Sequence, residues 1–118
     1  MKIQLETILK TVAEYYGLSL NLTKLKSRRA DIVKVNHVYF YLASNFTNES
    51  LTKIGRLVNR DHATVIHGVN KIRIEINLYL KIKTEIEDLI PMIQPRNSLV
   101  IENIDLLQLT ENYTRSFI

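Results

Sequence analysis

A run of five residues, Arg60-Asp61-His62-Ala63-Thr64, gathers side chains that can read the edges of DNA bases. A guanidinium such as that of Arg60 can pair with the O6 and N7 atoms of guanine, and the carboxylate of Asp61 can accept from the amino group of cytosine. His62 can donate to a base or to a phosphate, and Thr64 offers a hydroxyl and a methyl group. The run therefore predicts the first turn of a DNA-recognition helix.

The elements around this run have the layout of a helix-turn-helix. Ser50 can cap a short helix over residues 51–57, and residues 58–60 then form a tight turn. Within this turn, Asn59 is the residue best suited to a left-handed backbone. Asp61 caps the next helix, whose N-terminal end can enter a major groove. We expect four residues of this helix to face the core: Val65, Ile66, Val69 and Ile72.

Apolar residues at helical spacing predict further helices before the motif. One covers residues 3–16 and ends at Gly17, and a short element follows at residues 20–26. Residues 27–34 are polar and basic, which predicts an exposed loop. A second long helix is expected over residues 35–46.

Residues 72–82 fit two patterns. A strand is suggested by strict alternation of Ile72, Ile74, Ile76, Leu78, Leu80 and Ile82. A helix also fits, with Lys83 as its one polar mismatch. Because there is no glycine or proline from Val69 to Ile90, we predict one long helix and an all-α fold.

Pro91 and Pro95 predict a break after that helix. The sequence is accordingly divided into a helix-turn-helix domain, residues 1–90, and a C-terminal extension, residues 91–118. The extension is rich in leucine and isoleucine. Two interpretations stay open for it: a short helix that packs back on the domain, or a tail that binds a protein partner or a second copy.

The composition fits a small DNA-binding domain. The chain has 118 residues, of which 46% are hydrophobic and 24% charged, so one core can form. There is no cysteine and no apolar leader segment, so we expect a cytosolic protein without disulfides. The net charge of +4 is concentrated, since five basic residues lie between Lys24 and Lys34. Concentrated positive charge favours a polyanionic partner.

Arg28 and Arg29 lie within this basic stretch. On an exposed loop they could enter a narrow minor groove or neutralise phosphates. The alternative is an ordinary solvated loop. Ser50 and Thr52 lie at the start of the first motif helix, where free N–H groups can also meet a phosphate.

Several segments resemble one family in the same order. Ile54-Gly55-Arg56-Leu57 and the stretch from Arg60 to His67 resemble the signature of the C-terminal DNA-binding domain of DnaA, the bacterial replication initiator. Upstream, residues 12–16, 25–29 and 32–33 resemble the same domain. The resemblance covers residues 3–90 and none of the remainder.

The resemblance implies an all-α, Trp-repressor-like fold that binds short duplex sites called DnaA boxes. It implies base contacts in the major groove from the stretch Arg60 to Thr64, with Ala63 in a position where the family often has threonine. A minor-groove contact falls to Arg29 or its neighbour Arg28. Candidates for phosphate contacts are Lys26, Lys34 and His67.

The sequence also departs from the family pattern. The turn before Arg60 is one residue shorter, since Val58-Asn59 replaces Phe-Gly-Gly. Two basic positions are lost at Asn36 and Ser44, and Asp31 puts a negative charge into the predicted loop. Fewer phosphate contacts predict weaker binding with a flatter salt dependence.

Other function classes have less support. No nucleophile, base and orienting group come together in the sequence, so we expect no enzyme activity and no cofactor. His62 and His67 are five residues apart, which does not suit a metal site. With only three glycines, the chain has no phosphate-binding loop, so we expect the DNA-reading domain by itself. The alternative is a helical protein-interaction or dimerisation module whose DNA surface has drifted.

Overall fold

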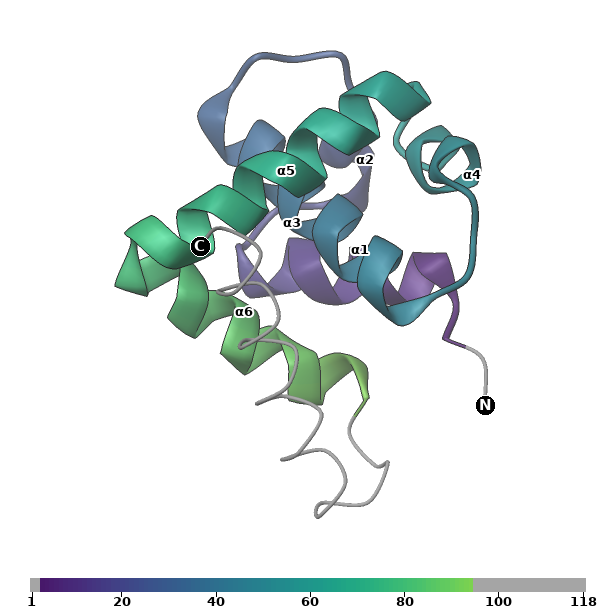
Figure 1. Ribbon diagram of the computed structural model, residues 1–118. Coiled ribbons are helices and arrows are strands. Elements are labelled where there is room, and N and C mark those ends of the chain that lie inside the picture. The colour runs from purple at the N-terminus through teal and green to yellow at the C-terminus, as the bar shows by residue number, and fades with distance from the viewer. Residues whose placement is uncertain (1–2, 95–118) are drawn as a thin grey trace.

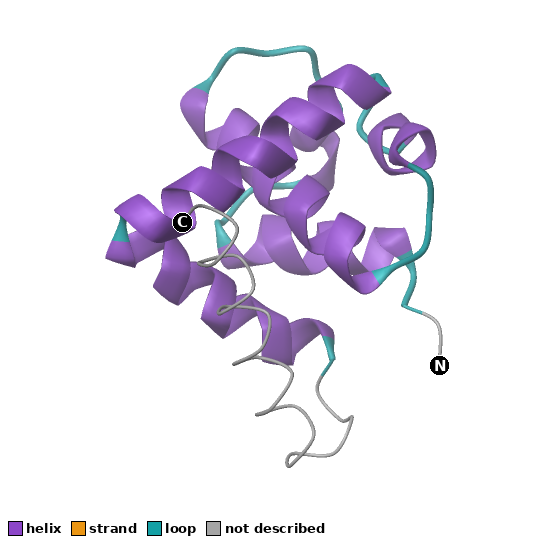
Figure 2. Cartoon of the chain, viewed as in Figure 1, coloured by secondary structure: helices purple, strands orange, loops and turns teal. Residues whose placement is uncertain are grey.

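The computed structural model describes residues 3–94, and this part of the chain consists of helices and loops without a strand (Figures 1 and 2). The fold class predicted from the sequence is therefore confirmed. The elements in chain order are α1 (Leu5–Tyr15), α2 (Leu20–Thr23), α3 (Ala30–Phe46), α4 (Leu51–Arg56), α5 (His62–Leu78) and α6 (Leu80–Ile93).

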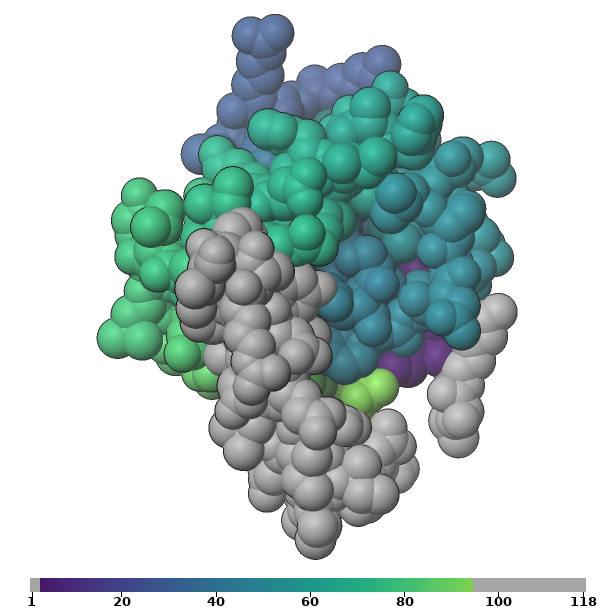
Figure 3. All heavy atoms as spheres, in the orientation of Figure 1, coloured from purple at the N-terminus to yellow at the C-terminus, as the bar shows by residue number. Residues whose placement is uncertain are grey.

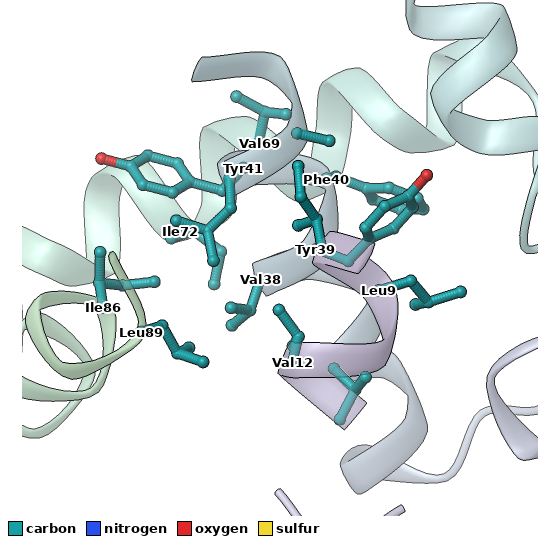
Figure 4. Close-up of a cluster of buried hydrophobic side chains, with 14 of the residues drawn as sticks. Leu9, Val12, Val38, Tyr39, Phe40, Tyr41, Val69, Ile72, Ile86 and Leu89 are labelled. Atoms are coloured by element: carbon teal, nitrogen blue, oxygen red, sulfur yellow. The ribbon is translucent and has the colours of Figure 1, made fainter. Parts of the chain in front are cut away.

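Helix α3 is the central element. Every residue from Val35 to Ala43 is buried, because α1 packs against one side of α3 and α5 packs against the other. Figure 4 shows Val38 of α3 among Val12 of α1, Ile72 of α5 and Leu89 of α6. Burying a large apolar side chain contributes about 2 kcal/mol, so this shared core holds the four helices together.

The sequence prediction of one long helix through residue 90 is wrong. Tyr79 has an extended backbone, with φ −128° and ψ 119°, and it separates α5 from α6. A continuous helix would have placed Lys83 on the apolar stripe. The single extended residue shifts the helical phase, so that Ile82 and Ile86 take the buried positions and Lys83 does not. The break also leaves Leu78, Tyr79 and Leu80 exposed at the corner.

Helix α6 turns back along α1 and is fixed there by hydrogen bonds. The hydroxyl of Tyr16 donates to Glu85 at 2.9 Å, and the hydroxyl of Tyr15 donates to Asp88 at 3.0 Å. The break predicted between Pro91 and Pro95 is confirmed, since α6 ends at Ile93, and Pro91 itself lies in the last turn of this helix. A proline near the end of a helix removes one backbone hydrogen bond without ending the helix at once.

The predicted basic loop is shorter in the structure, because α3 begins at Ala30 rather than at residue 35. Asp31 lies in the first turn of α3, and its carboxylate accepts from the backbone N–H of Ile32 at 2.8 Å. A negative charge at the N-terminal end of a helix interacts favourably with the positive end of the helix dipole and stabilises the helix. Residues 30–34 are therefore helical, and only residues 24–29 remain as the connection between α2 and α3.

Both ends of the described chain lie on the same side of the molecule. In Figure 1, the start of α1 and the end of α6 are at the bottom, whereas the α2–α3 connection and the start of α5 are at the top. The expectations for residues 95–118 lie outside the described residues. Among residues 3–94, no helix is both long and apolar enough to cross a membrane.

Candidate nucleic-acid interface

The first turn of α5 is held by a side-chain cap. Oδ1 of Asp61 accepts hydrogen bonds from the backbone N–H of Thr64 at 3.0 Å and from its hydroxyl at 2.7 Å. These two hydrogen bonds hold the pKa of Asp61 below its usual range. The predicted cap is thus confirmed, and the second carboxylate oxygen is left for another donor. His62 and Ala63 are both exposed on the same turn.

The turn between α4 and α5 closes despite its short length. Asn59 has a φ of 58°, which confirms the predicted left-handed residue. The backbone N–H of Arg60 then donates to the carbonyl of Gly55 at 2.9 Å. Gly55 permits this close approach, because a Cβ there would overlap the carbonyl oxygen of Arg60 and lie 2.8 Å from Cγ2 of Val65. The residue pair Gly55 and Asn59 therefore lets a shortened turn join the two motif helices.

The side chain of Arg60 lies across the turn and reaches a neighbouring loop. Its Nη2 donates to the carbonyl of Leu25 at 2.6 Å, and its Nη1 donates to the carbonyls of Val58 at 2.9 Å and Asn59 at 3.3 Å. The sequence predicts a base contact for Arg60. In the unbound protein, however, both terminal nitrogens already donate to backbone carbonyls.

Residues 24–29, here called the basic segment, lie next to the start of α5. Nδ2 of Asn59 donates to the carbonyl of Lys24 at 3.3 Å, which adds a second link beside that of Arg60. Four of the six residues in the basic segment are basic, and all four are exposed. Figure 3 shows the blue side chains of this part of the chain beside the teal surface of α5. The structure thus brings the two predicted DNA-binding clusters to one side of the molecule.

The two arginines of the basic segment have different surroundings. The guanidinium of Arg29 pairs with the carboxylate of Asp31, with nitrogen–oxygen distances of 2.7 and 3.1 Å. This pair raises the pKa of Arg29 and lowers the pKa of Asp31. Arg28 is exposed beside them. Asp31 therefore competes with a phosphate for Arg29 in a way that it does not for Arg28.

Lys34, a predicted phosphate contact, faces α6. Its ammonium lies 2.9 Å from a carboxylate oxygen of Glu85 and 5.1 Å from the centre of the Tyr16 ring. The structure therefore separates Lys34 from the basic segment, although the two are close in sequence.

His67 lies on the second turn of α5, and the centre of its ring is 5.7 Å from the centre of the His37 ring on α3. His37 is buried, and burial, with smaller contributions from His67 and Lys71, lowers the pKa of His37 to about 4. His67 itself is exposed, so it can still meet a phosphate. Within residues 3–94, no three side chains gather that could hold a metal ion.

Ser50 and Thr52 lie at the start of α4. The hydroxyl of Ser50 accepts from the backbone N–H of Lys53 at 3.1 Å, which confirms the predicted cap. Thr52 is exposed on the first turn of α4. The ammonium of Lys53 lies 3.2 Å from a carboxylate oxygen of Glu49.

Sequence reasoning placed Ile66 in the core, and this was wrong, since its side chain is 42% exposed. The inward positions of α5 include Val65, Val69 and Ile72, and Ile66 is rotated by about 100° from Val65. It falls instead on the outer face with His62, four residues earlier. Helical spacing leaves Ile66 at the border of the buried stripe, because it is three residues before the buried Val69. The open groove that Ile66 borders is also lined by Ser44, Asn45, Leu51, Val69, Asn70 and Arg73.

The fold and this interface define an all-α helix-turn-helix domain. The family described as bacterial DnaA protein helix-turn-helix matches residues 5–72, which is more than half of the chain. The chain belongs to this family. The predicted resemblance is therefore confirmed.

Three similar proteins are described as chromosomal replication initiator protein DnaA. The protein from Oenococcus oeni is 41% identical over 96 residues, which cover 80% of this chain and 21% of the initiator. The protein from Bacteroides thetaiotaomicron is 30% identical over 88 residues, covering 74% and 19% respectively. That from Roseiflexus castenholzii is 39% identical over 82 residues, covering 69% and 17%. The chain thus spans about a fifth of the length of these relatives.

Proposed function

We propose that this chain binds double-stranded DNA sequence-specifically, at sites of the DnaA-box type, and that it acts in the initiation of replication or its regulation. One observation carries the proposal. The capped first turn of α5, with His62 and Ala63 exposed, lies on the same side as the basic segment. An exposed helix end beside concentrated positive charge suits a duplex that is read in one groove and held by its phosphates.

The base contacts are assigned to the outer face of α5. Asp61 has a free carboxylate oxygen for a cytosine amino group, and His62 can donate to a base acceptor. The methyl groups of Ala63 and Thr64 can touch a thymine methyl. We add Ile66 to this set, because it is exposed four residues after His62 on the same face.

The contacts with the phosphates of the DNA backbone are assigned to three places on the protein. Lys26 and Arg28 extend from the basic segment, and Arg29 joins them when its pair with Asp31 opens. His67 meets a phosphate beside the major groove. Ser50 and Thr52 contact a phosphate at the start of α4. Phosphate contacts make the affinity for DNA fall as the salt concentration rises.

Fluorescence anisotropy tests the proposal at ~0.1 M salt, where phosphate contacts are only partly screened. A DnaA-box duplex and a scrambled duplex are titrated with the wild-type protein, with His62→Ala, and with Arg28→Ala/Arg29→Ala. Lys81→Ala/Lys83→Ala on α6 is the control, since it removes the same charge far from the interface.

We expect the wild-type protein and the α6 control to prefer the box. His62→Ala loses the preference but keeps binding to both duplexes, whereas the Arg28/Arg29 variant binds both less tightly. Equal weak binding of the wild-type protein to both duplexes would leave a non-specific DNA binder. Binding to neither would favour the alternative, a helical protein-interaction module.

A further inference from the structure

We propose that Arg60 and Asn59 are positioning residues, which fix the basic segment relative to the recognition helix. This inference rests on the proposed function and refines it. The two residues lie directly before α5, and each donates across to a carbonyl at the start of the basic segment. We call this pair of links the turn–loop clamp.

The geometry of the clamp is specific to the residue types present. The 2.6 Å hydrogen bond from Arg60 to Leu25 is charge-assisted, and such bonds are shorter and stronger than neutral ones. The same guanidinium also holds the carbonyls of Val58 and Asn59, so the planar group is fixed on both sides. The left-handed backbone of Asn59 in turn directs its side chain to Lys24.

The clamp has a consequence for reading DNA. Lys26, Arg28 and Arg29 lie within four residues after Leu25, so their distance from His62 depends on the point at which Arg60 holds the loop. A loop that is already ordered in the free protein loses less conformational entropy when the duplex binds, so the clamp should increase the affinity for a duplex that is contacted in two places. Arg60 thereby affects affinity through the loop and not through a base of its own.

The free protein gives the first test. Backbone ¹⁵N heteronuclear NOE values report motion on the picosecond-to-nanosecond timescale. We expect Arg60→Ala to lower the values for residues 24–29 while those of α3 and α5 stay unchanged. Asn59→Gly keeps the left-handed backbone and removes only the Nδ2 donor, so it lowers the same values less. Arg56→Ala on α4 is the matched control. Unchanged values in both clamp variants would overturn the proposal.

A double-mutant cycle on the DnaA-box duplex gives the second test. Arg60→Ala and Arg28→Ala/Arg29→Ala should each raise the Kd about tenfold, and the combined variant should lose little more than either, because the residues act through one loop. Independent effects would multiply to about a hundredfold. That outcome would overturn the proposal. Loss of preference at a single base pair in Arg60→Ala would also overturn it, and would make Arg60 a base-reading residue.

The two proposals fail in different ways. If the wild-type protein binds neither duplex, the proposed function fails. The NOE comparison then supports or overturns the clamp without DNA. If the wild-type protein prefers the box but the cycle shows independent effects, the function stands and the clamp fails.

Discussion

The ammonium of Lys34 and the carboxylate of Glu85 lie 2.9 Å apart, and this pair joins the start of α3 to α6. Glu85 also accepts from the hydroxyl of Tyr16, whose ring lies under the same ammonium. Lys34 therefore belongs to the packing of α6, although the family resemblance suggests a phosphate contact for it.

Lys34→Ala should leave the salt dependence of DNA binding unchanged. The slope of the logarithm of the binding constant against the logarithm of the salt concentration is negative, and it becomes less steep by about 0.9 for each phosphate contact that is lost. We expect this change in Arg28→Ala instead. Because Lys34 is 36% exposed, losing its ion pair should cost only about 0.5 kcal/mol of unfolding free energy. Anisotropy titrations at several salt concentrations check the slope. A flatter slope in Lys34→Ala would return this residue to the interface.

Gly55→Ala should destabilise the motif by about 2 kcal/mol, the range expected for an overpacked site. The added Cβ would overlap the carbonyl oxygen of Arg60, which is backbone and cannot rotate away. Gly17→Ala is the control, because a Cβ there meets nothing within 4 Å. Its only cost is the backbone strain of an alanine at a φ of 75°. Urea denaturation compares the two variants, and equal midpoints would contradict the prediction.

The stability of the protein should fall between pH 6.5 and pH 4. The pKa of His37 is about 4 in the folded protein and near 6.5 when unfolded, so in this window the unfolded chain binds more protons. The stability contributed by neutral His37 is therefore fully present well above pH 6.5, and about 2 kcal/mol of unfolding free energy should be lost by pH 5. Thermal unfolding at several pH values measures this loss. His37→Gln should reduce it and His62→Gln should not; the same pH profile in all three proteins would count against His37.

Asp61→Asn should keep the fold but change base preference. Asparagine caps a helix about as well as aspartate, so the unfolding free energy should change by only a few tenths of a kcal/mol. Asp61→Ala, in contrast, should lose about 1 kcal/mol. In DNA binding, an amide favours adenine where a carboxylate favours cytosine. Competition with duplexes altered at one base pair at a time would show the change, and an unaltered preference would remove Asp61 from the base-reading set.

Local signals in the sequence predicted the motif well. Ser50, Asn59 and Asp61 have the backbone and caps that their residue types favour. Such features depend on a few neighbouring residues, which is why a sequence can reveal them.

Features that depend on distant contacts were predicted less well. The α5–α6 break at Tyr79 follows from the need of Ile82 and Ile86 to reach the shared core, and no local breaker marks it. The partner of Lys34 is 51 residues away in sequence, and that of Arg60 is a backbone carbonyl. Neither contact leaves a pattern in residue types. Ile66 lies at the border of the buried stripe, where helical spacing does not decide which side it faces.

The position of the two ends has a practical consequence for tethering. The start of α1 and the end of α6 both lie across the core from the basic segment and the start of α5 (Figure 1). A fluorophore, a surface anchor or another protein domain attached by a linker at either point would stand clear of a bound duplex. If the chain binds DNA as proposed, the fold would therefore act as an adaptor that carries an attached group to the duplex while its binding surface stays open.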